Sequence, residues 1–165
     1  MKNLNNPLIF IVQDSVVYKD MIVSFLQSKN YNNLKNFNTA EDCLKALHLK
    51  PDIIVLDYSF GGITGLELMK KVQNEHPDIE FIFLSGQNDV EVAVTIMKMG
   101  AADYIVKNDK ALQNLLNSVE QFKSAKKRIK VKKGFQIGVI GFFIMMFLLI
   151  MIIILLTIFL EDFSL

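Results

Sequence analysis

The chain has 165 residues, a length that suits one domain of ordinary size and a shorter additional segment. Hydrophobic residues make up 52% of the sequence, more than soluble domains usually contain, and the excess is concentrated at residues 135–160. Because Cys43 is the only cysteine, an intrachain disulfide is excluded, as is usual in a reducing compartment. Cys43 shares a predicted helix face with Leu44 and Leu47, so we expect a packed apolar side chain and not a reactive thiol.

Five short segments of the first 122 residues are predicted to be β-strands, the second being the least apolar. They are residues 8–12, 33–37, 53–56, 81–84 and 104–106. Each strand is followed by a segment with apolar residues at helical spacing. These helical segments are residues 16–26, 40–49, 65–75, 90–99, and a last helix that starts near residue 110 and reaches a basic segment.

Residues that can accept hydrogen bonds from free backbone N–H groups stand before four of these helices. The predicted N-caps are Asp14 or Ser15, Thr39, Asn88 or Asp89, and Asp109. A helical segment between two strands is long enough to return the chain to the same end of the sheet, which favours parallel strand pairing. The strands lack alternation of polar and apolar residues, which is typical of a sheet that is covered on both faces. We therefore predict a three-layer, doubly wound, flavodoxin-like α/β domain with a five-stranded parallel sheet over residues 1–122.

Residues with phosphate or metal chemistry stand at the ends of four predicted strands. Gln13 and Asp14 follow the first strand, Asp57 the third, Ser85 the fourth and Lys107 the fifth. Ligands of an open parallel sheet bind in the crevice at the carboxyl ends of the strands, so these five side chains are expected to converge. Two carboxylates, a hydroxyl and an ammonium group suit Mg²⁺-assisted transfer of a phosphoryl group onto an aspartate.

Four longer motifs resemble segments of one family. Residues 51–57 (PDIIVLD), 65–68 (GLEL), 83–86 (FLSG) and 99–107 (MGAADYIVK) resemble, in register, the receiver domain, which is the phosphoacceptor module of two-component response regulators. The resemblance covers residues 8 to about 122 and implies the strand order 2-1-3-4-5.

The resemblance implies a role for each residue at the strand ends. Asp57 would be the nucleophile that receives a phosphoryl group from a histidine kinase or phosphotransferase. Asp14, Asp57 and the backbone carbonyl of Ser59 would bind Mg²⁺. Lys107 would neutralise charge on the transferred group, and Ser85 would donate a hydrogen bond to it after transfer.

Other implied roles concern signalling and the lifetime of the acyl phosphate. Movement of the Ser85 hydroxyl would be coupled to Tyr104, which would turn inward and reshape the surface of the fourth helix, fifth strand and fifth helix. Ser59 and Gln87 stand where side chains set how long the acyl phosphate lasts. Asp14 as a helix cap, Ser85 as a strand-end hydroxyl and Tyr104 as plain core are alternative interpretations.

Three positions depart from the family pattern. Gln13 replaces the first of two acids; its amide oxygen could hold a Mg²⁺-bound water, but the loss of one negative charge predicts weaker Mg²⁺ binding. Gly61 replaces a proline, which predicts a more mobile loop after Asp57. Asn108 replaces the proline after Lys107, so we expect a trans peptide bond between these two residues.

The C-terminal part of the chain has the composition of a membrane anchor. Residues 135–160 carry no charge, and a helix of this length is long enough to cross a hydrocarbon core of about 30 Å. The preceding basic juxtamembrane segment, residues 123–134, holds seven cations and no acid, whereas the short tail, residues 161–165, holds two acids. The positive-inside rule therefore predicts a single-pass protein of the cell membrane with residues 1–122 in the cytoplasm.

The basic cluster at residues 123–133 has two interpretations. Such a cluster can bind nucleic acid, but beside a membrane span we interpret it as a contact for anionic lipid and expect no nucleic-acid partner. Gly134 and Gly138 have a spacing that can bring two membrane helices together. A homodimer is therefore one expectation, and a helix that faces only lipid is the alternative.

Two functions fit the sequence. The first is a membrane-anchored, single-domain response regulator, with no output domain after the receiver, that accepts a phosphoryl group on Asp57 in a Mg²⁺-dependent phosphorelay. It would signal through contacts with an unknown downstream protein, and it would be no enzyme beyond catalysing its own phosphorylation and dephosphorylation. The alternative is a pseudo-receiver, a membrane-held interaction module that works without phosphorylation, which Gln13 and the two replaced prolines favour.

Overall fold

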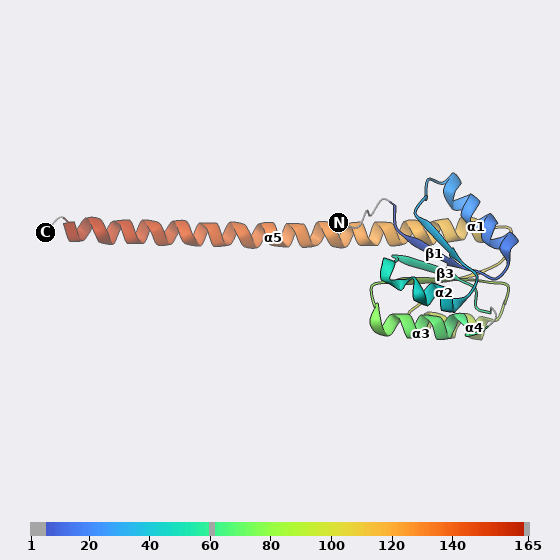
Figure 1. The fold of residues 1–165 in the computed structure, drawn as a ribbon. Helices are drawn as coiled ribbons and strands as arrows, with labels where there is room; N and C mark the ends of the chain where they lie inside the picture. The colour runs from blue at the N-terminus through green and yellow to red at the C-terminus, as the bar shows by residue number, and fades with distance from the viewer. Residues whose placement is uncertain (1–5, 60–61, 164–165) are drawn as a thin grey trace. The chain divides into compact units, whose positions relative to one another are not determined.

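The computed structural model of the chain describes residues 6–59 and 62–163; in the C-terminal helix, it describes side chains up to residue 129 and from 139 to 156. Five strands form one sheet: β1 (Ile9–Val12), β2 (Leu34–Phe37), β3 (Ile53–Leu56), β4 (Glu80–Ser85) and β5 (Asp103–Val106). All neighbouring strands are parallel, and their order is β2-β1-β3-β4-β5. Figure 1 labels β1 and β3 of this sheet together with the helices. The predicted fold class and strand order are confirmed.

The helices begin where the sequence supplies side-chain acceptors. They are α1 (Val16–Ser28), α2 (Ala40–Lys45), α3 (Gly65–Glu75), α4 (Val90–Lys98) and α5 (Ala111–Phe163). Side chains of Ser15, Thr39, Thr64 and Asp89 accept backbone N–H groups at the starts of the first four helices. Thr64 and Glu67 form a complete capping box, which holds the pKa of the Glu67 carboxyl below its usual value because the backbone N–H of Thr64 donates to it.

Two local predictions are wrong: the extent of the second helix and the residue that caps the last one. The segment predicted as one helix over residues 40–49 is divided, because α2 ends at Lys45 and a 3₁₀ turn, η1 (Leu47–Leu49), follows. Lys50 takes a left-handed conformation, with φ of 55°, directly before Pro51, which cannot continue a helix. In the turn before α5, Asn108 rather than Asp109 supplies the side-chain acceptor, since Asn108 Oδ1 lies 2.9 Å from Lys110 N.

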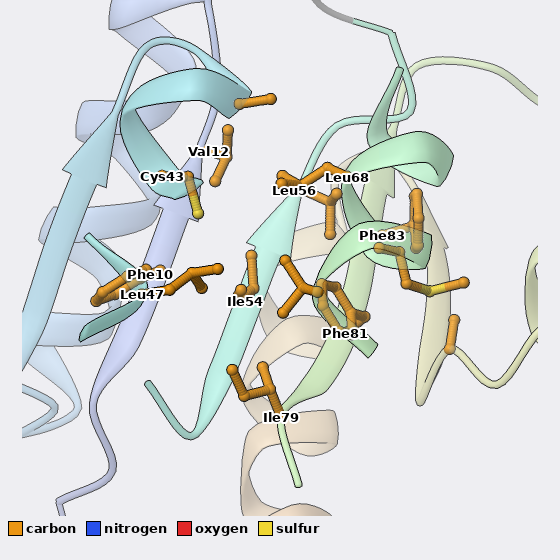
Figure 2. Packing of buried hydrophobic residues seen from close by; sticks show 14 of the residues in the cluster. Phe10, Val12, Cys43, Leu47, Ile54, Leu56, Leu68, Ile79, Phe81 and Phe83 are labelled. Carbon is orange, nitrogen blue, oxygen red and sulfur yellow. The ribbon is translucent and has the colours of Figure 1, made fainter. Parts of the chain in front are cut away.

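Successive residues of each strand point to opposite faces of the sheet, so the domain has two cores. On one face, side chains from β1, β3 and β4 pack against α2, α3 and α4. Figure 2 shows part of this core, and its labelled residues include Phe10, Ile54, Leu56, Phe81 and Phe83. On the other face, strand residues pack against α1 and α5, the latter through Ala111, Leu115 and Val119 at helical spacing. Each fully buried large side chain contributes about 1.5–3 kcal/mol to folding.

Cys43 lies in the first of these cores. Its side chain is completely buried, and burial raises the pKa of the thiol to about 12. The prediction of a packed apolar side chain is confirmed, and a buried thiol with a raised pKa is expected to be unreactive.

The chain divides into two compact units, residues 1–124 and residues 125–165. Residues 1–124 are called the receiver unit below, after the family that they resemble. In the second, Val139–Leu156 is a helical stretch of 18 residues with a mean hydropathy of 3.3, long and apolar enough to cross a membrane. None of this stretch is buried by other parts of the chain that the structure describes.

Candidate functional site

The strand register brings the predicted site residues to one edge of the sheet. Val12 pairs with Leu56, so the residues that follow them, Gln13 and Asp57, are neighbours. Ser85 pairs with Val106, and the backbone N–H of Lys107 donates to the carbonyl of Ser85 at 2.8 Å. The carboxyl ends of β1, β3, β4 and β5 therefore meet at one edge of the sheet, where ligands of open parallel sheets bind, and we call this edge the crevice.

Asp57 and Lys107 form an ion pair in this crevice. The Nζ atom of Lys107 lies 2.5 Å from Oδ2 of Asp57, and only 8% of the Asp57 residue surface is exposed. Oδ1 of Asp57 accepts a hydrogen bond of 3.4 Å from the backbone N–H of Ser59. A buried carboxylate held beside an ammonium group can act as a nucleophile at a centre whose negative charge the ammonium group offsets.

Gln13 connects the charged groups of the crevice. The residue is 2% exposed. The amide O and N of Gln13 are assigned so that the nitrogen faces acceptors and the oxygen faces a donor. In this assignment the nitrogen lies 3.1 Å from Asp57 Oδ2 and 3.3 Å from Asp14 Oδ1. In the same orientation its oxygen lies 2.8 Å from Lys107 Nζ. One neutral side chain thus contacts both carboxylates and the lysine.

Asp14 lies at the outer side of this group. Its side chain is exposed, and Oδ1 accepts a hydrogen bond of 2.7 Å from the backbone N–H of Ser15. The N-cap of α1 is Ser15, whose Oγ accepts from the backbone N–H of Tyr18, so Asp14 remains available to a ligand of the crevice.

Ser85 and Tyr104, whose movements are predicted to be coupled, are linked through the backbone of Gln87. The Ser85 hydroxyl oxygen, which is buried, accepts a hydrogen bond of 3.1 Å from Gln87 N. The carbonyl oxygen of Gln87 accepts a hydrogen bond of 2.8 Å from the Tyr104 hydroxyl. The half-buried Tyr104 ring also stacks on Phe83, with ring centroids 6.3 Å apart. A change at the Ser85 hydroxyl can therefore reach Tyr104 through two hydrogen bonds.

Tyr18, in the first turn of α1, is a site residue that the sequence analysis missed. Lys107 Nζ lies 4.6 Å from the centre of the Tyr18 ring, in cation–π contact. Burial and the negative charge of Asp57 both raise the pKa of the Tyr18 phenol. The available signal was its position in the first turn of the helix that directly follows Gln13 and Asp14.

Gly65 shapes the crevice from the start of α3. A Cβ atom at this position would lie 2.3 Å from the carbonyl oxygen of Asp57 and 3.1 Å from side-chain atoms of Leu56 and Phe83. The GLEL motif therefore begins with glycine because α3 approaches the backbone of the proposed phosphoacceptor too closely for any side chain.

Two expectations concern the loops around the crevice. The peptide bond between Lys107 and Asn108 is trans, as expected for a bond that precedes asparagine. The expected mobility of the loop at Gly61 lies outside the described residues.

The donor set fits Mg²⁺, although the described residues contain no cluster of three or more His, Cys, Asp or Glu side chains that could hold a metal. Asp14 and Asp57 each supply a carboxylate, which is the ligand type that Mg²⁺ prefers. Both carboxylates are within hydrogen-bond reach of one nitrogen atom, that of Gln13. A single hydrated cation can therefore reach both as well, since Mg²⁺ commonly binds through one or two carboxylates and several waters.

A sequence profile of the family described as the response regulator receiver domain matches residues 9–120. The chain belongs to this family. Receiver domains are phosphorylatable signalling modules of two-component systems; as a class they bind Mg²⁺ and interact with histidine kinases or phosphotransferases.

Two curated relatives and one solved structure illustrate the similarity. The chain is 37% identical over 89 residues to the uncharacterized transcriptional regulatory protein YesN of Bacillus subtilis, covering 54% of this chain and 24% of that protein. It is 32% identical over 130 residues to a putative NtrX-like response regulator of Rickettsia conorii, covering 75% of this chain and 27% of the relative. The chain thus spans about a quarter of the length of these two relatives.

The solved structure is the signal receiver domain of a putative Luxo repressor protein from Vibrio parahaemolyticus. Its TM-score is 0.69 at 19% identity, and the match covers 76% of this chain and 96% of that domain. At this identity the similarity supports the fold alone. It extends over nearly the whole of the solved domain.

Proposed function

We propose that this chain is a membrane-anchored response regulator that accepts a phosphoryl group on Asp57 in a Mg²⁺-dependent phosphorelay. The observation that carries the proposal is the ion pair between the buried Asp57 carboxylate and the half-buried Lys107, at the carboxyl ends of β3 and β5 in a receiver fold. The phosphodonor would be a histidine kinase or a phosphotransferase.

In the proposed reaction, a carboxylate oxygen of Asp57 attacks the phosphorus atom of a phosphohistidine. The new O–P bond forms as the N–P bond breaks, and the imidazole nitrogen leaves with the electron pair. Lys107 offsets the negative charge that the transferred group brings to the crevice. Asp14, Asp57 and the backbone carbonyl of Ser59 would hold Mg²⁺, which when bound neutralises charge on the phosphoryl oxygens. Gln13 is proposed as a further contact through a metal-bound water.

The proposed readout passes from Ser85 to Tyr104. After phosphorylation, the Ser85 hydroxyl would donate to a phosphoryl oxygen and lose its present contact with Gln87 N. The segment whose carbonyl holds the Tyr104 hydroxyl would then be free to shift, and Tyr104 with it. The resulting surface change would be read by a downstream protein. The exposed side chains of Ser59 and Gln87 are proposed to tune the lifetime of the acyl phosphate.

Membrane attachment is proposed for the apolar part of α5. The stretch Val139–Leu156 supports it by length and hydropathy, and seven cations at residues 123–133 would face anionic lipid on the cytoplasmic side. Expression in cells followed by carbonate extraction of membranes tests the proposal. Retention of the chain in the membrane pellet supports a span, and release by carbonate contradicts it.

The phosphorylation proposal is tested with the full chain in lipid nanodiscs, Mg²⁺ and beryllium fluoride. NMR shifts of amides near residues 57, 85, 104 and 107 should appear with both reagents together and vanish in Asp57→Ala. The pseudo-receiver alternative remains the second candidate, because the Gln13 amide already satisfies both carboxylates. No shift at millimolar Mg²⁺ would favour that alternative.

A further inference from the structure

The contacts of Gln13 suggest a role that its position alone did not indicate. The residue is almost fully buried at the end of β1, and its backbone is fixed by a hydrogen bond of 3.1 Å from Gln13 N to Phe37 O. With the amide O and N assigned so that each faces a complementary partner, its side chain donates to Asp57 Oδ2 and Asp14 Oδ1 and accepts from Lys107 Nζ. All three partners carry a formal charge, while Gln13 carries none.

These contacts match what a divalent cation would do between the same two carboxylates. Two carboxylates close together repel each other, and a receiver site offsets this repulsion by binding a cation. Here one amide N–H₂ group reaches both carboxylates, and hydrogen bonds to charged groups are stronger than those between neutral groups. The amide oxygen also gives Lys107 a second acceptor besides Asp57.

We infer that the Gln13 amide substitutes for the divalent cation in the resting site. The crevice is then ordered without a metal, and Mg²⁺ binds only when the Gln13 amide gives up its contacts with Asp14 and Asp57. Occupation of the site becomes a competition between an internal donor and the cation. This inference rests on the proposed function only for the statement that Mg²⁺ enters this crevice.

Gln13→Glu is the matched variant, because it replaces the amide N–H₂ by a carboxylate oxygen and keeps the shape of the side chain. It removes the donor to Asp14 and Asp57 and adds a third negative charge beside these two carboxylates. Gln13→Met keeps the length but removes both the donor and the acceptor, and it adds no charge. Comparing the two separates the effect of the amide from the effect of packing.

The experiment measures thermal unfolding of the receiver unit and Mg²⁺ affinity in the full chain, in lipid nanodiscs, with EDTA or with millimolar Mg²⁺. In EDTA we expect Gln13→Glu to lower the unfolding temperature by on the order of 5 °C. Mg²⁺ should raise the unfolding temperature of both variants more than that of the wild-type chain, because neither variant keeps the competing amide donor, and it should raise that of Gln13→Glu most because of the added negative charge. Gln13→Glu should bind Mg²⁺ on the order of tenfold more tightly than wild type.

If neither variant folds, hydrogen exchange of the Gln13 side chain in the wild-type chain tests the inference. In EDTA the side-chain N–H₂ protons of Gln13 should exchange slowly with solvent, and Mg²⁺ should abolish this protection. Rapid exchange in EDTA, or equal unfolding temperatures of wild type and Gln13→Glu in EDTA, would overturn the inference while leaving phosphorylation of Asp57 untouched. Conversely, protection in EDTA with no phosphorylation of Asp57 would uphold the inference and refute the proposed function.

Discussion

The receiver unit and the apolar part of α5 use the same kinds of side chain in opposite ways. Ile54, Leu56 and Phe83 in the sheet are at most 1% exposed, whereas Phe143 and Leu155 in α5 are 66% and 64% exposed. In the sheet, helices cover both faces, so the apolar strands find their partners within the chain. In Val139–Leu156, the described part of the chain supplies no such cover.

The difference shows that hydrophobicity alone does not determine whether a segment is buried in a domain core or in a membrane. Burial of apolar area contributes about 25 cal/mol per Å² wherever it occurs, but the partner can be the rest of the domain or a lipid phase. Strand-length apolar segments with helices between them lead to a domain core. An uninterrupted helical segment of membrane length requires an external apolar environment.

Removal of the apolar region is expected to have the largest effect. A chain that ends after Ser124 should fold as the receiver unit and move from the membrane fraction to the soluble fraction, because it keeps both cores and loses Val139–Leu156. Fractionation of cells and the circular dichroism of the purified truncated chain check this. A truncated chain that stays in the membrane pellet, or that does not fold, would contradict the separation of the two regions.

Matched substitutions compare the two regions directly. Phe81→Ala should lower the free energy of unfolding of the receiver unit by about 3–5 kcal/mol, because Phe81 is completely buried. Phe143→Ala should change it by less than about 0.5 kcal/mol, as expected for an exposed position. Denaturant unfolding of the full chain, followed by the signal of the receiver unit, measures both. Equal effects would mean that the two regions are not energetically separate.

Gly65→Ala tests how closely the fold approaches the proposed site. The added methyl group would stand 2.3 Å from the carbonyl oxygen of Asp57, so backbone movement is required. We expect a loss of about 1–3 kcal/mol in unfolding free energy and slower phosphorylation of Asp57. Gly86→Ala is the control, since a Cβ atom there meets nothing within 4 Å. Similar behaviour of the two variants would show that the close approach has no consequence.

Cys43 provides a pH-dependent test of core burial. Burial raises the pKa of its thiol to about 12, against about 8.5 in the unfolded chain, so the folded state retains a proton that the unfolded state loses. This contribution to stability is complete below about pH 8.5 and is lost as the pH rises towards 12. Between about pH 8.5 and 9.5 the unfolding free energy should fall on the order of 1 kcal/mol more in wild type than in Cys43→Ala. Rapid alkylation of Cys43 in the folded chain at pH 8.5 would contradict its burial.

The smallest predicted effect concerns the contact between Tyr18 and Lys107. Tyr18→Leu should slow phosphorylation about two- to fivefold, because a cation–π contact of about 0.5–1 kcal/mol holds Lys107 over the crevice. Tyr18→Phe keeps the ring and should retain most of the rate. If both variants lose the same activity, the hydroxyl group and not the ring face is responsible.

The order of the strands and the residues at their ends could be predicted from apolar segments and family motifs. What could not be predicted depends on neighbours far apart in the sequence. The orientation of the Gln13 amide is set by Asp57 and Lys107, and the need for glycine at position 65 by the backbone of Asp57. β4 begins at Glu80, before the apolar run, because Glu80 pairs with Ile53 of the neighbouring strand.

The most direct test of the account is the intact mass of the full chain after incubation with acetyl phosphate and Mg²⁺. The account predicts the addition of one phosphoryl group, absent in Asp57→Asn and absent in EDTA. An unchanged wild-type mass at millimolar Mg²⁺, or an adduct that persists in Asp57→Asn, would contradict it.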